Sequence, residues 1–311
     1  MSCLNISELP SPPRGRKGWP WIEEGSQLPG KMPDGQPWPK ISIVTPSYNQ
    51  GQFIEETIRS VLLQGYPNLE YIVIDGGSSD NSVEIIMKYE KWLTHWVSEP
   101  DKGQSNAINK GFGSASGEIY GWLNSDDYLL KNALLNIVKA YRTSPSAGAW
   151  CGGSLFANEQ GKKIAVRWPA RLDLESIARW NKNSFAQPAC FFSRKAWQEC
   201  GPLDEALHYG MDFDLWLKIA KRFLFAKVNA VLAFERLHKG SKTQRDSGLM
   251  YAMQCVIQIR HGYERFAIQD ISMWMDEYIA LTRKLGLISR FPLFRPFRPL
   301  VRIAWRKFLG F

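Results

Sequence analysis

Short apolar runs alternate with stretches of helical spacing between residues 40 and 130, and this alternation restricts the fold more than any other feature of the chain. Runs of β-branched residues indicate buried strands, whereas apolar residues three and four positions apart indicate amphipathic helices. Repeated strand–helix units predict a parallel sheet with right-handed crossovers. Each run stops at glycine, aspartate, serine or asparagine, and open α/β sheets bind ligands outside these carboxyl ends. We therefore predict an α/β fold with strands at 41–44, 71–74, 96–97 and 119–123.

The rest of the chain divides into an arm, the remainder of this domain and a helical extension. Residues 1–39 are rich in proline and glycine and predict an extended N-terminal arm. We expect the α/β domain to cover residues 40–245, and residues 246–311 to form a C-terminal helical extension. Beyond residue 142 the periodicity is less regular; it predicts strands at 149–156, 185–192 and 223–233, a helix within 208–222, and two helices near 249–262 and 270–285.

The net charge of +9 is concentrated at the C-terminus, where residues 286–311 carry six cations and no acid, leaving +3 for the rest. Helical spacing puts Leu300, Trp305 and Phe308 on one side of this tail and the basic residues mostly on the other. A basic amphipathic segment with Trp and Phe is typical of an interfacial anchor, so we expect residues 290–311 to touch an anionic membrane surface. The alternative is a helix that packs on its own domain or on a dimer partner.

The five cysteines are scattered and none forms a C-x-x-C pair, so neither a disulfide framework nor a zinc site is indicated. This cysteine usage fits a reducing cytosol. No apolar run reaches the roughly 18 residues that span a bilayer, and the first residues lack a signal-peptide pattern. We expect a cytoplasmic protein that lies peripherally on the cytoplasmic face of the membrane.

Two adjacent carboxylates, Asp126 and Asp127, follow the last of the four predicted strands. They would repel each other without a nearby cation. Carboxylate oxygens suit Mg²⁺ or Mn²⁺, which usually also hold substrate phosphates, so Asp126 is predicted to hold a metal-bound diphosphate with support from Asp127. Alternatively, Ser125 caps a helix that starts near Lys131, and the two aspartates favour its positive end.

Three segments in the same order and spacing resemble family 2 glycosyltransferases, which have the GT-A fold, a mostly parallel sheet flanked by helices. They are ISIVTPSYNQGQFIEETIRSVLLQGYPNLEYIVIDGGSSDNS, SEPDKGQSNAINKGF and WLNSDD, and the resemblance extends from about Ile41 to about Lys242. It implies transfer of a sugar from a nucleoside-diphosphate donor, with UDP as the expected nucleotide, to a hydroxyl acceptor on a glycan or a lipid-linked glycan. Such chemistry belongs to the assembly of cell-surface polysaccharide or glycolipid.

The resemblance assigns the base and ribose to Thr45, Pro46 and Tyr48, and a hydrogen bond from the base N3–H to Asp75. An aromatic ring at position 48 stacks on a base, a contact worth roughly 1–3 kcal/mol. Alternatively, Tyr48 packs on the domain, and Asp75 belongs to an ordinary turn. The family often has a second Asp where this chain has Gly76.

The resemblance also places Lys102 near the phosphates, although a solvated loop lysine is the alternative. The family's D-x-D motif here starts with an amide, Asn124. We therefore predict Asp126 as the direct metal ligand and Asn124 or Asp127 as ribose or supporting contacts. Asn106 stands where many relatives carry Asp and is a lesser candidate for a sugar contact.

The expected catalytic base lies at the start of a later helix, where the resemblance selects Asp212. Its alternative is a helix-cap carboxylate, and this alternative applies more strongly to Asp214. His238 and Lys242 resemble a late loop that closes over the diphosphate, a role for which Arg236 also qualifies. A base that activates the acceptor hydroxyl for a single displacement implies inversion at the anomeric carbon.

Two other function classes fit parts of the pattern. The first is another nucleotide-binding enzyme, such as a nucleotidyltransferase or a dehydrogenase, but no G-x-G-x-x-G or P-loop follows the first strand. The second is a non-catalytic membrane-surface or nucleic-acid binder that uses the basic tail. This interpretation does not explain the carboxylates of Asp75, Asp101, Asp126 and Asp212, because anions repel a phosphate backbone. No nucleic acid partner is therefore expected.

The resemblance to family 2 glycosyltransferases also makes Gln187 a candidate residue on the acceptor side of the site.

Overall fold

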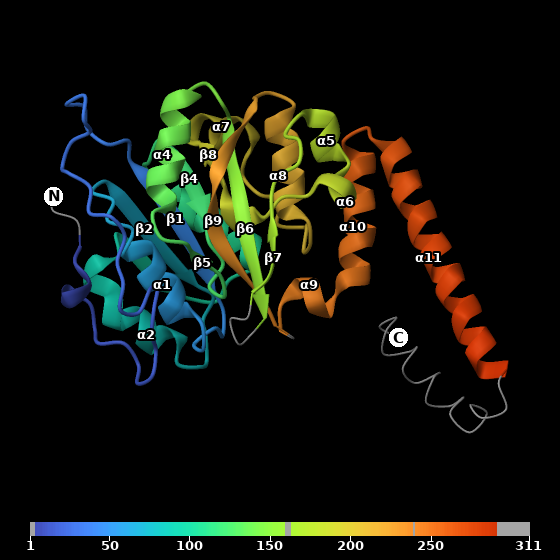
Figure 1. The fold of residues 1–311 in the computed structure, drawn as a ribbon, viewed down its shortest axis with the longest axis horizontal. Helices are drawn as coiled ribbons and strands as arrows, with labels where there is room; N and C mark the ends of the chain where they lie inside the picture. Colours follow the sequence, from blue (N-terminus) through green and yellow to red (C-terminus); the bar gives the residue numbers. More distant parts are fainter. Residues whose placement is uncertain (1–3, 159–162, 239, 291–311) are drawn as a thin grey trace.

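A computed structural model describes residues 4–158, 163–238 and 240–290 of the chain. One β-sheet runs through the body with helices on both faces, and two further helices, α10 and α11, extend from one side (Figure 1). The predicted α/β fold is therefore confirmed. The basic tail, residues 291–311, lies outside the described residues, so its predicted contact with a membrane stays a prediction.

The described strands pair in the order β3-β2-β1-β4-β8-β6-β9-β5, and β7 pairs with the outer part of β6. The first half of the sheet is parallel: β1 lies between β2 and β4, and β3 pairs with β2. In the second half, β8 runs antiparallel to both β4 and β6, whereas β9 is parallel to β6. The strands are β1 (Ile41–Ser47), β2 (Leu69–Asp75), β3 (His95–Ser98), β4 (Ile119–Trp122), β5 (Tyr128–Leu129), β6 (Ala149–Asn158), β7 (Lys163–Arg167), β8 (Cys190–Ser193) and β9 (Phe225–Leu237).

The helices build one hydrophobic core on each face of the sheet. Helices α1, α2 and α4 cover one face, and α3, α5, α6, α7 and α8 cover the other (Figure 1). Strand β1 contributes to both cores, with Ile43 on the first face and Val44 on the second, as expected of a central parallel strand. The α-helices are α1 (Ile54–Leu62), α2 (Ser82–Tyr89), α3 (Gln104–Gly113), α4 (Ala133–Thr143), α5 (Leu174–Ala178), α6 (Trp180–Asn183), α7 (Arg194–Cys200), α8 (Met211–Ala220), α9 (Lys242–Arg245), α10 (Ser247–Arg260) and α11 (Glu264–Arg290); 3₁₀ turns are η1 (Ile6–Glu8), η2 (Glu90–Trp92) and η3 (Gln187–Ala189).

Two predicted strands differ from the structure. The strand predicted at 185–192 is wrong in its first half, because residues 187–189 form the 3₁₀ turn η3 and only Cys190–Ser193 pair in the sheet. Pro188 at the start of this turn lacks an N–H group and cannot donate to a strand ladder. The strand predicted at 223–233 continues four residues further, to Leu237.

A buried arginine fixes the N-terminal arm to the domain. The Arg59 guanidinium is fully buried, and it donates to the carbonyl oxygens of Pro10 at 2.8 Å, Trp21 at 3.0 Å and Pro20 at 3.1 Å. It also donates to the Tyr89 hydroxyl at 3.2 Å. The arm therefore follows the outer surface of α1 without forming a strand, since its carbonyl groups find their partner in a side chain.

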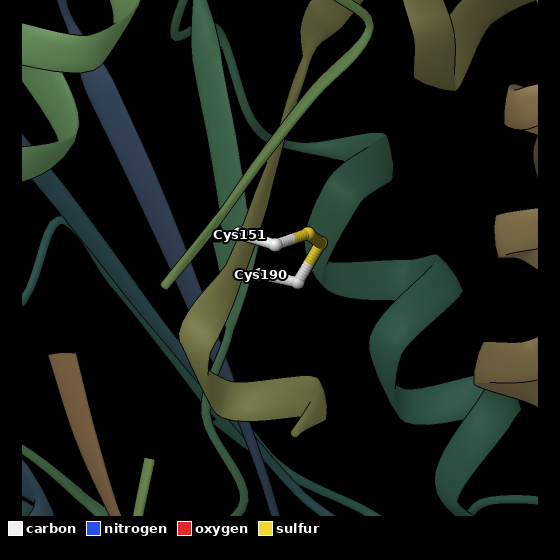
Figure 2. Close-up of a disulfide and its surroundings, with 2 residues drawn as sticks. All are labelled: Cys151 and Cys190. Carbon is white, nitrogen blue, oxygen red and sulfur yellow. A yellow bond between two sulfur atoms is a disulfide. The ribbon is translucent and has the colours of Figure 1, made fainter. Parts of the chain in front are cut away.

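The cysteine interpretation needs one correction. Cys151 and Cys190 form a disulfide between neighbouring strands, whereas no disulfide was expected from the sequence (Figure 2). The antiparallel register of β6 and β8 puts these two residues opposite each other, with 4.2 Å between their Cα atoms. They are separated by 39 residues, so no local spacing motif in the sequence indicates that they pair. Cys200 and Cys255 are free and buried.

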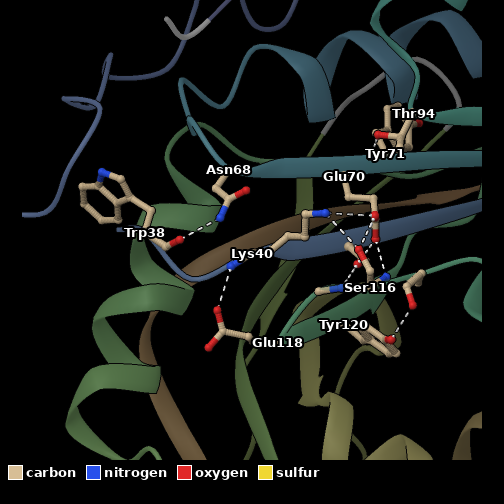
Figure 3. Close-up of polar contacts among 12 residues, drawn as sticks. Trp38, Lys40, Asn68, Glu70, Tyr71, Thr94, Ser116, Glu118 and Tyr120 are labelled. Atoms are coloured by element: carbon tan, nitrogen blue, oxygen red, sulfur yellow. Dashed lines mark hydrogen bonds and ion pairs between the residues drawn. The ribbon is translucent and has the colours of Figure 1, made fainter. Parts of the chain in front are cut away.

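A buried carboxylate joins the amino ends of β1 and β2 to the loop before β4. Glu70 accepts hydrogen bonds from the backbone N–H and the hydroxyl of Ser116, each at 2.7 Å, and from the hydroxyl of Ser42 (Figure 3). The Lys40 ammonium lies 3.4 Å away. Burial alone would raise the pKa of Glu70, but these hydrogen bonds and the lysine charge outweigh it and hold the pKa below its ordinary value of 4.5.

We predict that Glu70→Gln lowers the free energy of unfolding at pH 7 by about 1–3 kcal/mol, because donors placed for a carboxylate lose their acceptor. A depressed carboxyl pKa contributes stability above pH 4.5 that disappears as the pH falls through the lower folded value. The difference between wild type and variant should therefore shrink in acid. Urea unfolding at pH 7 and pH 3.5 measures it, with Glu118→Gln, an exposed neighbour, as the control. A constant difference across this range would contradict the assignment.

Candidate active site

The loop after β4 meets the end of β9 at the carboxyl edge of the sheet. Asp126 Oδ2 lies 2.9 Å from His238 Nε2, and the Asp126 carbonyl accepts a hydrogen bond from Arg236 Nε at 3.2 Å. The Asp126 carboxylate is 18% exposed and His238 is 7% exposed. Strand β9 extends to Leu237, further than predicted, and therefore brings His238 to Asp126, the predicted metal ligand.

Asp127 points inward and holds this loop to β9. Its Oδ1 accepts the backbone N–H of Arg236 at 3.0 Å, and its carbonyl accepts the Thr57 hydroxyl at 2.6 Å. Burial, and then the negative charges of Asp126 and Glu235, raise the pKa of Asp127 well above its ordinary value. This geometry agrees with the predicted support of Asp126, while a ribose contact by Asp127 stays a prediction. The helix that Ser125 was proposed to cap begins only at Ala133.

Arg236 makes its main contacts within the protein. Its guanidinium forms a buried ion pair with Glu56, at 2.8 Å, and stacks over the ring of Phe53 at 4.8 Å. Truncating one partner of a buried pair is strongly destabilising, since the other charge stays unpaired. Arg236 therefore holds β9 against α1 and donates to the Asp126 carbonyl, while His238 contacts the Asp126 carboxylate.

The residues predicted to bind the nucleotide lie at the ends of β1 and β2. Thr45 and Pro46 are buried in β1, and the Thr45 hydroxyl lies 3.0 Å from the Tyr71 hydroxyl. Tyr48 follows the strand and is 63% exposed, so the alternative in which its ring packs on the domain is wrong. An exposed ring beside a strand end is available for stacking on a base.

Asp75 is fully buried at the end of β2, and donors in the following loop and in β3 occupy most of the hydrogen-bond acceptor positions of its carboxylate. Oδ2 accepts the hydroxyl of Ser98 at 2.7 Å and the backbone N–H groups of Ser78 at 2.8 Å and Gly77 at 3.2 Å, and Oδ1 accepts the Ser78 hydroxyl at 2.6 Å. A carboxylate has about four acceptor positions. Asp75 thus stabilises the turn, which the alternative interpretation anticipated, and its contact with a base stays a prediction.

A carboxylate from another loop occupies the space beside Gly76. A Cβ atom on Gly76 would lie 2.7 Å from Oδ2 of Asp101, closer than real Cβ contacts come. Asp101 Oδ1 also accepts the backbone N–H of Gly103 at 2.7 Å, which fixes the side chain over the glycine. The loop after β3 therefore brings a carboxylate to the place where family members often have a second aspartate. Asp101 was not among the predicted site residues.

Side-chain amides form a hydrogen-bonded chain beside the loop that carries Asp126. Asn124 accepts from Gln104 Nε2 at 2.7 Å and donates to Gln187 Oε1 at 3.4 Å, and Gln187 Nε2 donates to the Trp122 carbonyl at 2.9 Å. The structure thus places the predicted acceptor-side residue next to Asn124. Lys102 is exposed at the rim. Asn106 donates to both carboxylate oxygens of Glu205, at 3.0 and 3.1 Å, instead of facing the site.

The two aspartates at the start of α8 have different environments. Asp214 is buried, and it contacts His261 Nε2 at 2.8 Å and Lys218 Nζ at 2.7 Å. Burial would raise the pKa of Asp214, but these hydrogen bonds lower it overall. Asp212 is half-buried, and burial raises its pKa. Asp214 therefore has the structural role anticipated for it, and Asp212 remains the candidate base.

Lys242 provides the nearest described cation to this base. Its ammonium donates to the His208 carbonyl at 3.2 Å, its pKa is lowered by burial, and its charge opposes the rise in the pKa of Asp212. Gly210 precedes the helix with a φ of +72°, and a Cβ there would lie 2.7 Å from Ile257 Cδ1. Only glycine suits both conditions, so this position fixes the approach to Asp212.

The metal prediction can be compared with the available donors. Within the described parts of the chain, no group of three or more His, Cys, Asp or Glu side chains could enclose an ion. Asp126 and His238 together offer one carboxylate and one imidazole. Mg²⁺ and Mn²⁺ are commonly held by one or two protein ligands together with substrate phosphates and waters. The pair therefore fits a metal that arrives with a diphosphate, and the imidazole suits Mn²⁺ better than Mg²⁺.

Comparison with known proteins agrees with this geometry. The family model for glycosyl transferase family 2 matches residues 42–201, which is half of the chain. An uncharacterized glycosyltransferase of Rickettsia typhi is 27% identical over 217 residues, and the match covers 66% of each chain. Chondroitin synthase of Pasteurella multocida is 27% identical over 247 residues, which are 75% of this chain and 25% of the synthase. This chain thus spans less than two thirds of the length of these relatives.

Solved structures share the fold at low sequence identity. The S. aureus TarS fragment 1–349 in complex with UDP-GlcNAc superposes with a TM-score of 0.55 at 17% identity, covering 83% of this chain and 78% of the fragment. The mannosyltransferase PcManGT of Pyrobaculum calidifontis, in complex with GDP-Man and Mn²⁺, gives 0.54 at 18% identity and covers 87% of both chains. From the sheet order, the carboxylates at its edge and these matches, the chain belongs to glycosyl transferase family 2 and has the GT-A fold.

Proposed function

We propose that this glycosyltransferase moves a sugar from a UDP-sugar to a hydroxyl of a glycan or lipid-linked glycan, with inversion at the anomeric carbon and with Mn²⁺ or Mg²⁺ as cofactor. The observation that carries the proposal is the contact of Asp126 with His238 at the same sheet edge as Asp212. TarS binds UDP-GlcNAc and PcManGT binds GDP-Man with Mn²⁺. Their likeness supports a nucleotide-sugar donor here.

The predicted donor-site residues have the following roles in this proposal. Tyr48 stacks on the base, beside Thr45, Pro46 and Asp75, and the exposure of its ring leaves it free to do so. A divalent metal neutralises the charge that develops on the leaving diphosphate. Asp126 and His238 hold the metal-bound diphosphate, while Lys102 and Lys242 approach from the rim. Asn124 and Asp127 keep Asp126 in place.

Proton transfer is assigned to Asp212. It accepts the proton of the acceptor hydroxyl, which then attacks the anomeric carbon from the side opposite the diphosphate. Because burial raises the pKa of Asp212, its carboxylate binds a proton more strongly than a solvated aspartate. One displacement with no covalent intermediate inverts the anomeric configuration.

A second part of the proposal concerns the membrane. Among the described helices, none is both long enough and apolar enough to cross a membrane. Large apolar side chains are nevertheless exposed along α10 and α11, and the second of these helices leads directly into the basic tail. Together they favour peripheral binding to an anionic, cytoplasmic membrane surface, where lipid-linked acceptors are found. The exposed side chains are Leu249, Tyr251, Val256, Ile259, Ile268, Ile271, Met273, Trp274, Met275 and Ile279.

The donor proposal is tested by a hydrolysis screen of nucleotide sugars. We expect slow release of UDP from one or more UDP-sugars with Mn²⁺, and loss of this activity with EDTA. Asp126→Ala should reduce metal-dependent UDP affinity by more than about 10-fold, because it removes the carboxylate that contacts the ion. Isothermal calorimetry with and without Mn²⁺ measures this affinity. Unchanged binding of UDP by the variant would remove Asp126 from the metal site.

The proposed base is tested against its neighbour on the same helix. Asp212→Asn should keep UDP affinity but lower kcat by roughly 10²–10⁴-fold, the usual contribution of a general base. Asp214→Asn should instead lower Tm with a much smaller effect on kcat, because its carboxylate bonds to His261 and Lys218. Steady-state kinetics and thermal unfolding separate the two effects. Normal turnover in Asp212→Asn would exclude Asp212 as the base.

Membrane binding is tested by co-sedimentation with vesicles. The full-length protein should bind vesicles that contain anionic phosphatidylglycerol and bind neutral phosphatidylcholine weakly, since the tail is basic. Trp274→Ser with Met275→Ser should weaken binding through lost apolar contact, and Arg302→Glu with Arg306→Glu should weaken it through lost charge. Equal sedimentation of all variants would end the membrane proposal. A dimer in light scattering that the serine variant abolishes would show that a second copy covers the apolar surface.

A further inference from the structure

Glu235 is a half-buried acid in β9, and neither the sequence prediction nor the proposed mechanism assigns it a role. Its neighbours in the strand, Phe234 and Arg236, face the first core, where Phe234 stacks on Tyr128 at 4.3 Å. Because side chains alternate along a strand, Glu235 lies on the opposite face of the sheet, the face that α8 covers. It is paired in register with Phe156 of β6.

One oxygen of this carboxylate has no protein partner. Glu235 Oε1 is buried, and no hydrogen-bond donor within the described residues contacts it. A buried polar atom without a partner costs roughly 1–3 kcal/mol, so such atoms usually have a functional explanation. The nearby Ser154 hydroxyl donates to the Ala233 carbonyl at 3.2 Å, which leaves Oε1 unbonded.

The position of Glu235 in β9 puts it near both ends of the proposed reaction. The next residue, Arg236, donates its backbone N–H to Asp127 in the acidic loop, and the helix that begins with Met211 and Asp212 covers the face of the sheet on which Glu235 lies. Burial raises the pKa of Glu235 to about 7; the Ser154 hydroxyl and the Arg167 charge oppose this rise, whereas the negative charges of Asp212 and Asp126 add to it. Asp126 belongs to the diphosphate end, and Asp212 belongs to the acceptor end. The sugar that is transferred must lie between them, because its anomeric carbon is bonded to the diphosphate and attacked by the acceptor. Glu235 therefore borders the space for the donor sugar ring.

We propose that Glu235 determines the donor sugar: its free oxygen accepts a hydrogen bond from a hydroxyl of the transferred sugar, and the carboxylates of Glu235, Asp126 and Asp212 together favour a neutral hexose or N-acetylhexosamine over a uronic acid. The proposal rests on the function proposed above. A site with a buried acceptor discriminates strongly against a ligand that cannot satisfy it. A uronate would also put a fourth carboxylate beside Asp126, Asp212 and Glu235, where like charges repel.

The test compares UDP-glucose, UDP-galactose, UDP-GlcNAc and UDP-glucuronate, with UDP alone as the reference ligand. The wild type should hydrolyse at least one neutral UDP-sugar and discriminate against UDP-glucuronate. Glu235→Gln keeps the shape of the side chain but exchanges the charged acceptor for a weaker neutral amide oxygen, and it should lower kcat/KM for the preferred neutral sugar by roughly 10-fold, because hydrogen bonds to charged groups are the stronger ones. Calorimetry should show the same loss as a smaller affinity difference between UDP-sugar and UDP, with UDP affinity unchanged.

A stability measurement and a control variant distinguish a specific loss of sugar binding from a general loss of folding. Glu235→Gln removes a buried charge without changing volume, so its Tm should equal or exceed that of the wild type. Lys227→Gln, an exposed position of the same strand, should leave the sugar preference unchanged.

The outcomes separate the two proposals. Wild-type kinetics of Glu235→Gln on every UDP-sugar, or efficient use of UDP-glucuronate by the wild type, would overturn the role of Glu235 and leave the glycosyltransferase function intact. Failure of the wild type to bind UDP or turn over any UDP-sugar would overturn the proposed donor, and the sugar-selecting role with it. A selective loss for neutral sugars, with UDP binding preserved, would support both.

Discussion

The contact between the loop after β4 and the end of β9 unites the two halves of this protein. The parallel half supplies Asp126 and Asp127, and the mixed half supplies Arg236 and His238. One bond uses the backbone of β9, and the other uses a side chain two residues further along. Together they fix the strand end relative to the acidic loop. Strands β4 and β8 already pair the two halves within one sheet, and this contact adds a second link at the carboxyl edge.

The same contact explains how polar groups are distributed around the site. Asp127 and Arg236 are buried and make hydrogen bonds within the protein, whereas Asp126 keeps part of its carboxylate open to solvent. On α8, Asp214 is bound by His261 and Lys218, and Asp212 is not. In both pairs of acids, one member stabilises the fold and leaves the other available for chemistry. Asp214 is neutralised by Lys218 and its hydrogen bonds, whereas the raised pKa of the buried Asp127 favours its uncharged form beside Asp126. Both arrangements reduce the repulsion between neighbouring carboxylates.

The first four strands, their connecting helices and the acidic loop could be predicted from the sequence, because each is a local pattern of apolar spacing and strand-ending residues. The second half of the sheet could only be predicted in part. Glu235 and Arg236 are charged, yet β9 continues through them to Leu237, since pairing with β6 and the bond to Asp127 outweigh their weak strand propensity. The pairing of Cys151 with Cys190 depends on strand register, which spacing along the chain does not contain. The contact of Asp101 with Gly76 and the surroundings of Glu235 could not be predicted for the same reason, because they depend on neighbours that are distant in sequence.

The close approach of Asp101 to Gly76 has a consequence for comparing members of this family. A motif search confined to the loop after β2 would score this chain as having lost an acidic position. In the fold, the adjacent loop places the Asp101 carboxylate in the volume that a side chain at position 76 would need. An aspartate substituted at position 76 would therefore meet a second negative charge at close range and would displace Asp101. The acidity of this corner of the sheet thus depends on the packing of two loops and cannot be scored from either loop alone.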